Sequence, residues 1–221
     1  MVDNRTVPRP THAYHGLSQP SRLLIAYVVM RRPGLGLEEL SEHTGLHENT
    51  VREHIGVLVD EGILRSEVHH RGTRGRPRAI FFAVDADDDS PVAQRRVDDA
   101  IQRGDLLRRV VAMDAGDLDD TALHQLDALY EHLDGVGLGP EIDERQLTVD
   151  LKPCRFHALM DSQPEAICQV HETLIRDVLR RAGGPIEVDR LHPLVTPHDC
   201  RLHLRLSDSR DEPDELHETR Q

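Results

Sequence analysis

The most regular hydrophobic pattern of the chain lies in residues 37–84. A first short helix is predicted from Leu37 and Leu40, which fall on one face, and Gly45 supplies a sharp turn after it. A second helix is predicted because three apolar residues at i, i+4 and i+7 bury one of its faces until Gly62 ends it. These three residues are Val51, Ile55 and Leu58.

Two strands are predicted to follow the second helix, from residues 63–67 and 80–84. The order of helix, turn, helix and hairpin is that of a winged helix-turn-helix domain. Polar residues at the start of the second helix point away from its buried face, where a recognition helix reaches base edges and phosphates of DNA. The candidate DNA-binding residues of this helix are Glu48, Asn49, Thr50, Arg52 and His54, with Glu53 beside them.

The predicted wing is basic although the net charge of the whole chain is -13. Residues 63–84 hold five arginines against the single acid Glu67. A cluster of like charges is costly unless an anion meets it, so the cluster indicates contact with DNA phosphate, and a merely solvated hairpin is the alternative. Arg74-Gly75-Arg76-Pro77 also resembles the core of an AT-hook, whose arginines enter a narrow minor groove. The wing candidates are Arg71, Arg74, Arg76 and Arg78, and the fifth arginine is Arg65.

Changes of pattern along the 221 residues predict an α+β protein with an N-terminal winged helix-turn-helix domain, a helical connector and a small C-terminal α+β sensor domain. Ser18 is the expected cap of the first helix. Residues 147–151, 186–191 and 201–206 are predicted strands. A capping box at residues 162–165 predicts a helix that runs to residue 183. The expected parts are a flexible arm at 1–17, the winged domain at 18–84, an acidic linker with connecting and dimer-forming helices at 85–135, the sensor domain at 136–206 and a disordered tail at 207–221.

Helical spacing at residues 92–112 and 117–134 supports the connecting helices, although both could also pack only against their own domain. No apolar run approaches the roughly 20 residues of a membrane helix, and residues 1–20 lack the order of a signal peptide. We therefore expect a cytoplasmic protein with no membrane partner. Three cysteines, an odd number, do not indicate a disulfide framework, so they are ligands, sensors or buried thiols.

All three cysteines fall in the predicted sensor domain, at joints between elements. Cys154 follows the first strand, Cys168 is in the second turn of the helix, and Cys200 leads into the last strand. Their spacing is not that of a zinc ribbon or a ferredoxin, and buried structural thiols are the ordinary reading of such residues. Each cysteine nevertheless has a histidine close to it in sequence, which keeps a metal or cluster site open. The histidines are His157, His171 and His198.

Several segments together resemble the SufR-like iron-sulfur regulators. The sensor region of that family is similar to Lys152-Pro153-Cys154-Arg155-Phe156-His157, Pro164-Glu165-Ala166-Ile167-Cys168 with His171, Leu191-His192-Pro193-Leu194-Val195 and Pro197-His198-Asp199-Cys200. Its DNA-binding domain is similar to Asn49-Thr50-Val51-Arg52-Glu53-His54 and Gly75-Arg76-Pro77-Arg78. The resemblance leaves out roughly residues 90–145.

This resemblance implies a homodimeric repressor of iron-sulfur cluster assembly genes that binds double-stranded operator DNA. It further implies a 4Fe-4S cluster held by Cys154, Cys168 and Cys200. Two departures from the family pattern stand out: the usual Cys-Pro-Phe reads Cys154-Arg155-Phe156, and the fourth cysteine of some members is missing. The fourth iron would then need His171, His198, Asp199, a small molecule or no ligand, and an iron with incomplete thiolate ligation is more open to oxidants.

Two other functions remain open from the residues alone. The first is a winged-helix regulator whose C-terminal domain holds zinc, a small ligand or nothing. The second is an enzyme that uses Cys168 as nucleophile and His171 as base, one helical turn apart. No glycine motif for an oxyanion and no third orienting group accompanies this pair, so we expect the protein not to be an enzyme.

Overall fold

The computed structural model describes residues 16–69, 77–111, 118–152, 164–196 and 199–207. Most of the arm expected at 1–17 and of the tail expected at 207–221 lies outside these residues, as do the start of the capping box at 162–165, Arg71, Arg74, Arg76, Cys154, His157 and His198. No helix in the described part of the chain has the length and apolar character needed to cross a membrane.

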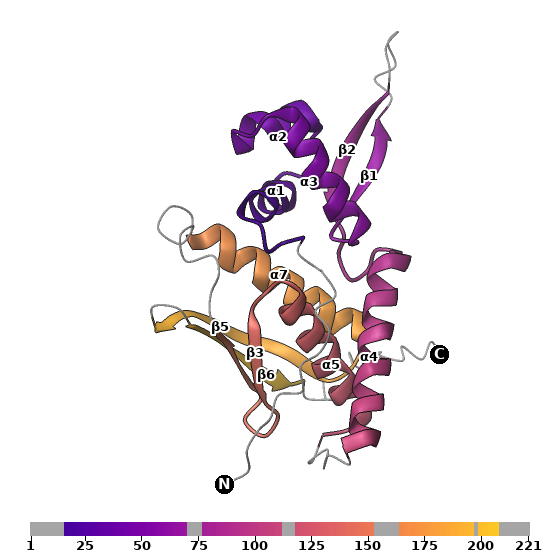
Figure 1. Ribbon diagram of the computed structural model, residues 1–221, viewed down its shortest axis with the longest axis vertical. Coiled ribbons are helices and arrows are strands. Elements are labelled where there is room, and N and C mark those ends of the chain that lie inside the picture. The colour runs from indigo at the N-terminus through magenta and orange to yellow at the C-terminus, as the bar shows by residue number, and fades with distance from the viewer. Residues whose placement is uncertain (1–15, 70–76, 112–117, 153–163, 197–198, 208–221) are drawn as a thin grey trace, which may run out of the picture.

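The N-terminal part is a winged helix-turn-helix domain, as the sequence predicts (Figure 1). Its elements are α1 (Pro20–Arg31), α2 (Leu37–Thr44), α3 (Glu48–Asp60), β1 (Leu64–His69) and β2 (Arg78–Ala83). The two strands pair antiparallel from Leu64 with Ala83 to His69 with Arg78. The predicted spacing on α3 is confirmed, because the residues buried on this helix are Val51, Ile55 and Leu58.

The start of α1 differs from the expectation. The residue at the N-cap position is Gln19, whose side chain makes no capping hydrogen bond, so Ser18 lies one position too early to cap the helix. Pro20 occupies the first helical position, where its missing N–H removes one of the donors that a cap would otherwise satisfy. The backbone carbonyl of Gln19 accepts from the N–H groups of Arg22 and Leu23.

The C-terminal part combines helices with one antiparallel sheet, which gives the α+β class that the sequence predicts. Its elements are α4 (Pro91–Val111), α5 (Asp120–Gly135), β3 (Gly139–Asp143), β4 (Thr148–Lys152), α7 (Pro164–Ala182), β5 (Ile186–Thr196) and β6 (Asp199–Leu206). The strand order is β3-β4-β6-β5. Helices α5 and α7 pack against each other, with α7 against β5 and α5 against β3.

One hydrophobic core runs through both parts of the chain. Helix α7 lies between α1 and the sheet in Figure 1, and it contacts both α1 and β5. Buried residues of α1, α5, α7 and the sheet therefore belong to a single cluster. Because α5 contributes to this cluster, the segment expected to connect and dimerise also builds the core of the C-terminal part. Helix α7 is therefore a direct packing link between the sheet and the winged domain.

Helix α4 approaches α5 closely at Gly104. A Cβ at this position would meet the carboxylate of Asp127 at about 2.1 Å, so the absence of a side chain allows the contact. Arg108 then binds Asp127 through two hydrogen bonds, with Nη1 3.0 Å from Oδ1 and Nη2 2.7 Å from Oδ2. Gly104 lowers the helix propensity of α4, but it permits the close approach of α4 to Asp127 of α5.

Candidate nucleic-acid interface and metal centre

The turn of the helix-turn-helix motif is held by short-range contacts. Gly45 follows α2 with a φ of 69°, a left-handed conformation that a glycine adopts without strain. Ser41 donates a hydrogen bond from Oγ to the backbone carbonyl of Leu46 across the turn. Leu40, Val51 and the other buried residues of these helices then fix the direction in which α3 projects.

The start of α3 presents polar side chains to solvent. Nδ1 of His47 accepts a hydrogen bond from the backbone N–H of Asn49 at 3.2 Å and caps the helix. Asn49 and Arg52 are both exposed, and Nη1 of Arg52 donates to Oδ1 of Asn49 at 2.7 Å. The two residues therefore form one hydrogen-bonded unit on the outer face of the helix.

The other candidates on α3 differ in exposure. Glu48 is exposed, whereas Thr50 and His54 are half-buried. Burial lowers the pKa of His54, and the nearby charge of Arg22 lowers it further, while Glu53 acts in the opposite direction. His54 is therefore a neutral imidazole near neutral pH, which hydrogen-bonds without adding positive charge.

The described arginines of the wing are bound within the protein. The guanidinium of Arg65 stacks over the ring of Phe82, 4.7 Å from its centroid, and pairs with Glu67 and with Asp88 of the acidic linker. Nη2 of Arg78 lies 3.3 Å from Oε1 of Glu39. The count of five arginines against one acid therefore overstated the free positive charge of the wing. Two of the five arginines form ion pairs with acids outside the hairpin.

Glu39 was not identified in the sequence as a residue that caps α2 and pairs with an arginine of the wing. Its Oε2 accepts the backbone N–H of Gly36 at 2.7 Å, which caps α2, while Oε1 faces Arg78. The recognisable signal was an acid three residues after a helix cap. Its effect is to tie the helix-turn-helix unit to the first residue of β2, next to the hairpin loop, so that Arg78 is held in place beside the motif.

Cys168 and Cys200 lie near enough to each other for the charge of one to affect the other. Burial raises the pKa of the Cys168 thiol, and the proximity of Cys200 and Glu172 raises it further. Both cysteines are partly buried against the main hydrophobic core. Cys200 is in β6, where its Cα pairs with Leu151 of β4.

Cys154 lies outside the described residues, but the chain limits its distance from the other two. Strand β4 ends at Lys152, two residues before Cys154. The three residues from Leu151 to Cys154 span at most about 11 Å. Leu151 is the Cα partner of Cys200, so the described chain that leads toward Cys154 runs beside Cys200.

The candidate fourth ligands fall in different places. His171 is buried on α7, and burial lowers its pKa to about 4, so its imidazole is neutral. It acts on the pKa of His132 of α5, which places it near that residue. Asp199 begins β6 and pairs with Thr196. Within the described ranges, no three His, Cys, Asp or Glu side chains gather closely enough to hold a metal ion, so a site here depends on Cys154.

The enzyme alternative gains nothing from this geometry. A nucleophilic cysteine needs a lowered thiol pKa, and the pKa of Cys168 is raised. The pKa of His171 is lowered to about 4 by burial in the core. An activated pair needs a thiol with a lowered pKa and a basic imidazole. Here the thiol pKa is raised and the imidazole is weakly basic, which is the opposite arrangement.

A family model for the IclR helix-turn-helix domain matches residues 24–67, from α1 to the middle of β1. The chain carries an IclR-type helix-turn-helix DNA-binding domain. Its helices and turn have the geometry that such a domain uses to bind double-stranded DNA, and the protein is accordingly a DNA-binding transcription regulator. The match ends before the cysteines, so the likeness to SufR-like regulators stays a prediction. No curated protein matches the chain.

Proposed function

We propose that this regulator is a homodimeric repressor of iron-sulfur cluster assembly genes, and that its affinity for operator DNA depends on a 4Fe-4S cluster. Cys154, Cys168 and Cys200 would hold the cluster in a cytoplasmic protein. The observation that carries the proposal is the pairing of Leu151 with Cys200, because Leu151 lies three residues before Cys154 in the chain.

The donor set fits such a group. Thiolates are the usual ligands of iron-sulfur clusters, and Cys168 of α7 and Cys200 of β6 would supply two of them, with Cys154 as the third. The fourth iron would be left to His171, His198, Asp199 or a small molecule. A bound cluster would supply an iron site open to oxidants, and the residues of this chain would convert its presence into a change of structure.

Helix α7 provides the route from the cysteines to DNA. Cys168 lies near its first turn, and the same helix packs against α1 of the winged domain. Tying Cys168 to Cys154 and Cys200 would hold the start of α7 against the sheet and so fix the position of α1. In a dimer this would set the spacing of two recognition helices, which must match half-sites about one DNA turn apart.

The dimer interface is expected on the second half of α4. Leu106, Val110 and Val111 are 60%, 73% and 53% exposed, and they lie within five residues of one another on one helix. A solvated cluster of large apolar side chains on a surface helix is characteristic of a contact with another protein. A second copy of the chain is the partner that a repressor of paired half-sites requires.

Anaerobic purification of the full chain tests the proposal. We expect about four irons and four sulfides per monomer, with broad visible absorption. Operator DNA selected from a random pool should bind the cluster-loaded dimer more tightly than the protein after iron removal, at equal monomer concentration. A colourless protein with one zinc, or equal affinity with and without iron, contradicts the proposal.

A further inference from the structure

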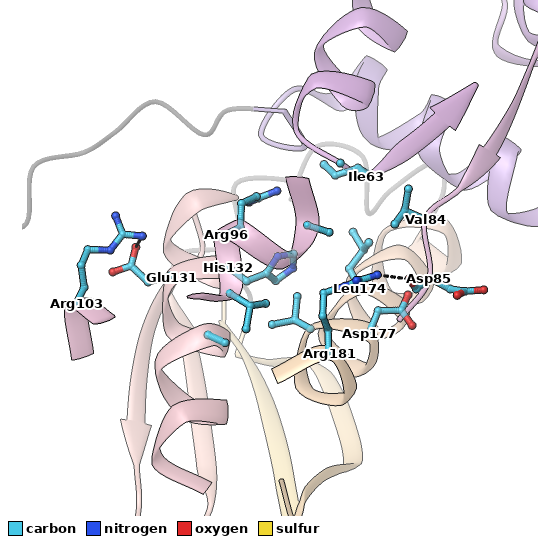
Figure 2. Close-up of a pocket in the computed structure, with 15 residues that line it drawn as sticks. Ile63, Val84, Asp85, Arg96, Arg103, Glu131, His132, Leu174, Asp177 and Arg181 are labelled. Atoms are coloured by element: carbon cyan, nitrogen blue, oxygen red, sulfur yellow. Dashed lines mark hydrogen bonds and ion pairs between the residues drawn. The ribbon is translucent and has the colours of Figure 1, made fainter. Parts of the chain in front are cut away.

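A small cavity lies where the winged domain meets the C-terminal helices (Figure 2). Its volume is about 80 Å³. The winged domain contributes the turn after α3 and the end of the hairpin, and α4, α5 and α7 supply the remaining walls. Most of the lining is apolar, with Ile63, Val84, Val97, Ala128, Leu174 and Val178.

A buried histidine borders this apolar space. His132 of α5 exposes only 8% of its surface, and its Nε2 has no hydrogen-bond partner among the described residues. The imidazole ring lies among the lining side chains in Figure 2. A buried nitrogen in this state destabilises a protein unless a water or a ligand binds it, so this atom offers a hydrogen bond to a molecule in the cavity.

The charge beside His132 is positive. Arg96 of α4 lies next to the ring in Figure 2, and its charge adds to the effect of burial in lowering the pKa of His132 to about 3. Arg96 also donates from Nη1 to the backbone carbonyl of Glu61, which holds it at the edge of the cavity. A neutral imidazole and a guanidinium together can bind one carboxylate, the first through N–H and the second by charge.

The other charged groups of the lining have partners elsewhere. Arg103 pairs with Glu131 at 3.4 Å, and Arg181 donates to the backbone carbonyls of Asp85 and Asp88. Asp177 is on the opposite side, where burial raises its pKa, Arg180 and Arg181 lower it, and the like charge of Asp85 raises it. Glu131 is thus paired with Arg103, while Asp85 and Asp177 lie at the opposite end of the cavity from Arg96 and His132.

We propose that this cavity binds a small aliphatic monocarboxylate. The carboxylate would lie between Arg96 and Nε2 of His132, and the hydrocarbon part would contact Val97, Ala128 and Leu174. A volume of about 80 Å³ holds roughly two or three water-sized groups at about 30 Å³ each, which suits the short carbon chain of an acid such as butyrate with its carboxylate at the edge of the cavity. Because the walls come from both parts of the chain, the bound acid would alter how the winged domain sits on α7, independently of any cluster.

The first test is calorimetric titration of the full-length protein, without metal, with sodium butyrate at pH 7. Saturable binding of one butyrate per chain is expected, with butyramide and butylamine at least tenfold weaker because each lacks the carboxylate. Equal binding of butyrate and butyramide would show an apolar cavity with no carboxylate site. The absence of heat and of any thermal shift up to 20 mM butyrate would show a hydrated cavity only, and both results overturn the proposal.

Two variants locate the site. His132→Phe removes Nε2, and Ala128→Leu fills the apolar end without touching a charged group; each should weaken butyrate binding at least tenfold while the circular dichroism spectrum is kept. His124→Phe is the matched control, since His124 is on the same helix but outside the cavity. If His132→Phe fails to fold, Ala128→Leu decides alone. Butyrate binding by Ala128→Leu equal to that of the wild type would place the ligand elsewhere.

Discussion

Arg52 donates a hydrogen bond to the side-chain amide oxygen of Asn49 across one turn of the recognition helix, at 2.7 Å. If both residues read base edges, Ala at either position should reduce the preference for a selected operator over random DNA by about 1 to 3 kcal/mol. The double variant should lose less than the two single losses combined, because each single variant already disrupts the shared unit.

Fluorescence anisotropy with both DNAs at several salt concentrations measures this preference. A preserved melting temperature for each variant excludes a folding defect. Equal loss on operator and random DNA would mean that Asn49 and Arg52 contact only the phosphate backbone, and additive losses would mean that they act separately.

Arg76 and Arg65 should behave differently although both belong to the wing. Arg76→Ala should weaken DNA binding and lower its dependence on salt, because an arginine in a groove displaces counterions. Arg65→Ala is the control: Arg65 is committed to Phe82, Glu67 and Asp88, so its loss should reduce stability and leave the salt dependence unchanged. The measurement is the slope of the logarithm of affinity against the logarithm of salt concentration. An unchanged slope for Arg76→Ala would remove this part of the wing from the interface.

The sequence predicted those features that depend on near neighbours in the chain. The apolar spacing of Val51, Ile55 and Leu58 defined the recognition helix, and Gly45 marked its turn. Strand β3 was missed, since Gly139 and Pro140 are poor strand formers, and an edge strand tolerates them. Periodicity says nothing about a strand that is specified mainly by its partner.

Contacts between distant segments could not be read from the sequence. The packing of α1 on α7, which merges the two parts into one core, depends on tertiary geometry. For the same reason Asp88 could not be recognised as a partner of Arg65, nor His132 as a lining residue of a cavity. The sequence showed that the cysteines are candidate metal ligands. The pairing of Leu151 with Cys200 could be seen only from the register of the sheet.

Gln125 should be the most sensitive polar residue of the C-terminal core. It is buried on α5, donates to the carbonyls of Leu179 and Ile186, and accepts the N–H of Ile186 at 2.7 Å. Gln125→Leu would leave these backbone groups unsatisfied and should lower the free energy of unfolding by about 2 to 4 kcal/mol. Urea unfolding checks this, with Gln102→Leu on the exposed face of α4 as a control expected within about 0.5 kcal/mol of wild type. A similar small loss at Gln125 would contradict the inferred role.

Acid should destabilise the protein through its buried histidines. Burial, followed by the charge of Arg96, lowers the pKa of His132 to about 3 from the usual 6.5. The unfolded chain therefore binds more protons between these two pH values. Above pH 6.5 His132 has no effect on the free energy of unfolding, and below pH 6.5 it lowers this free energy as the pH falls. The slope is at most about 1.4 kcal/mol per pH unit for one histidine.

Urea unfolding at pH 6.5 and 5.5 would measure this effect. Between these two pH values the free energy of unfolding of His132→Phe should fall by about 1 kcal/mol less than that of wild type. The reason is that the variant lacks one histidine that is neutral when folded and protonated when unfolded. His171, with its pKa lowered to about 4, continues to contribute in both proteins. Identical losses for the two proteins would mean that His132 is protonated in the folded state.

The three cysteines should contribute to one cluster with little redundancy. Cys154→Ser, Cys168→Ser and Cys200→Ser should each abolish or sharply reduce iron and sulfide content, because a cluster with three protein ligands cannot spare one. Residues 24–67, which form the helix-turn-helix domain, include no cysteine, so the variants should keep their helical content and bind operator DNA with the affinity of the iron-free wild type. His171→Ala separates the remaining cases: it should have little effect if a small molecule is the fourth ligand, and an effect comparable to a serine variant if the histidine binds iron. Full iron content and visible absorbance in all three serine variants would remove the cluster from this site and leave its thiols as part of the hydrophobic core.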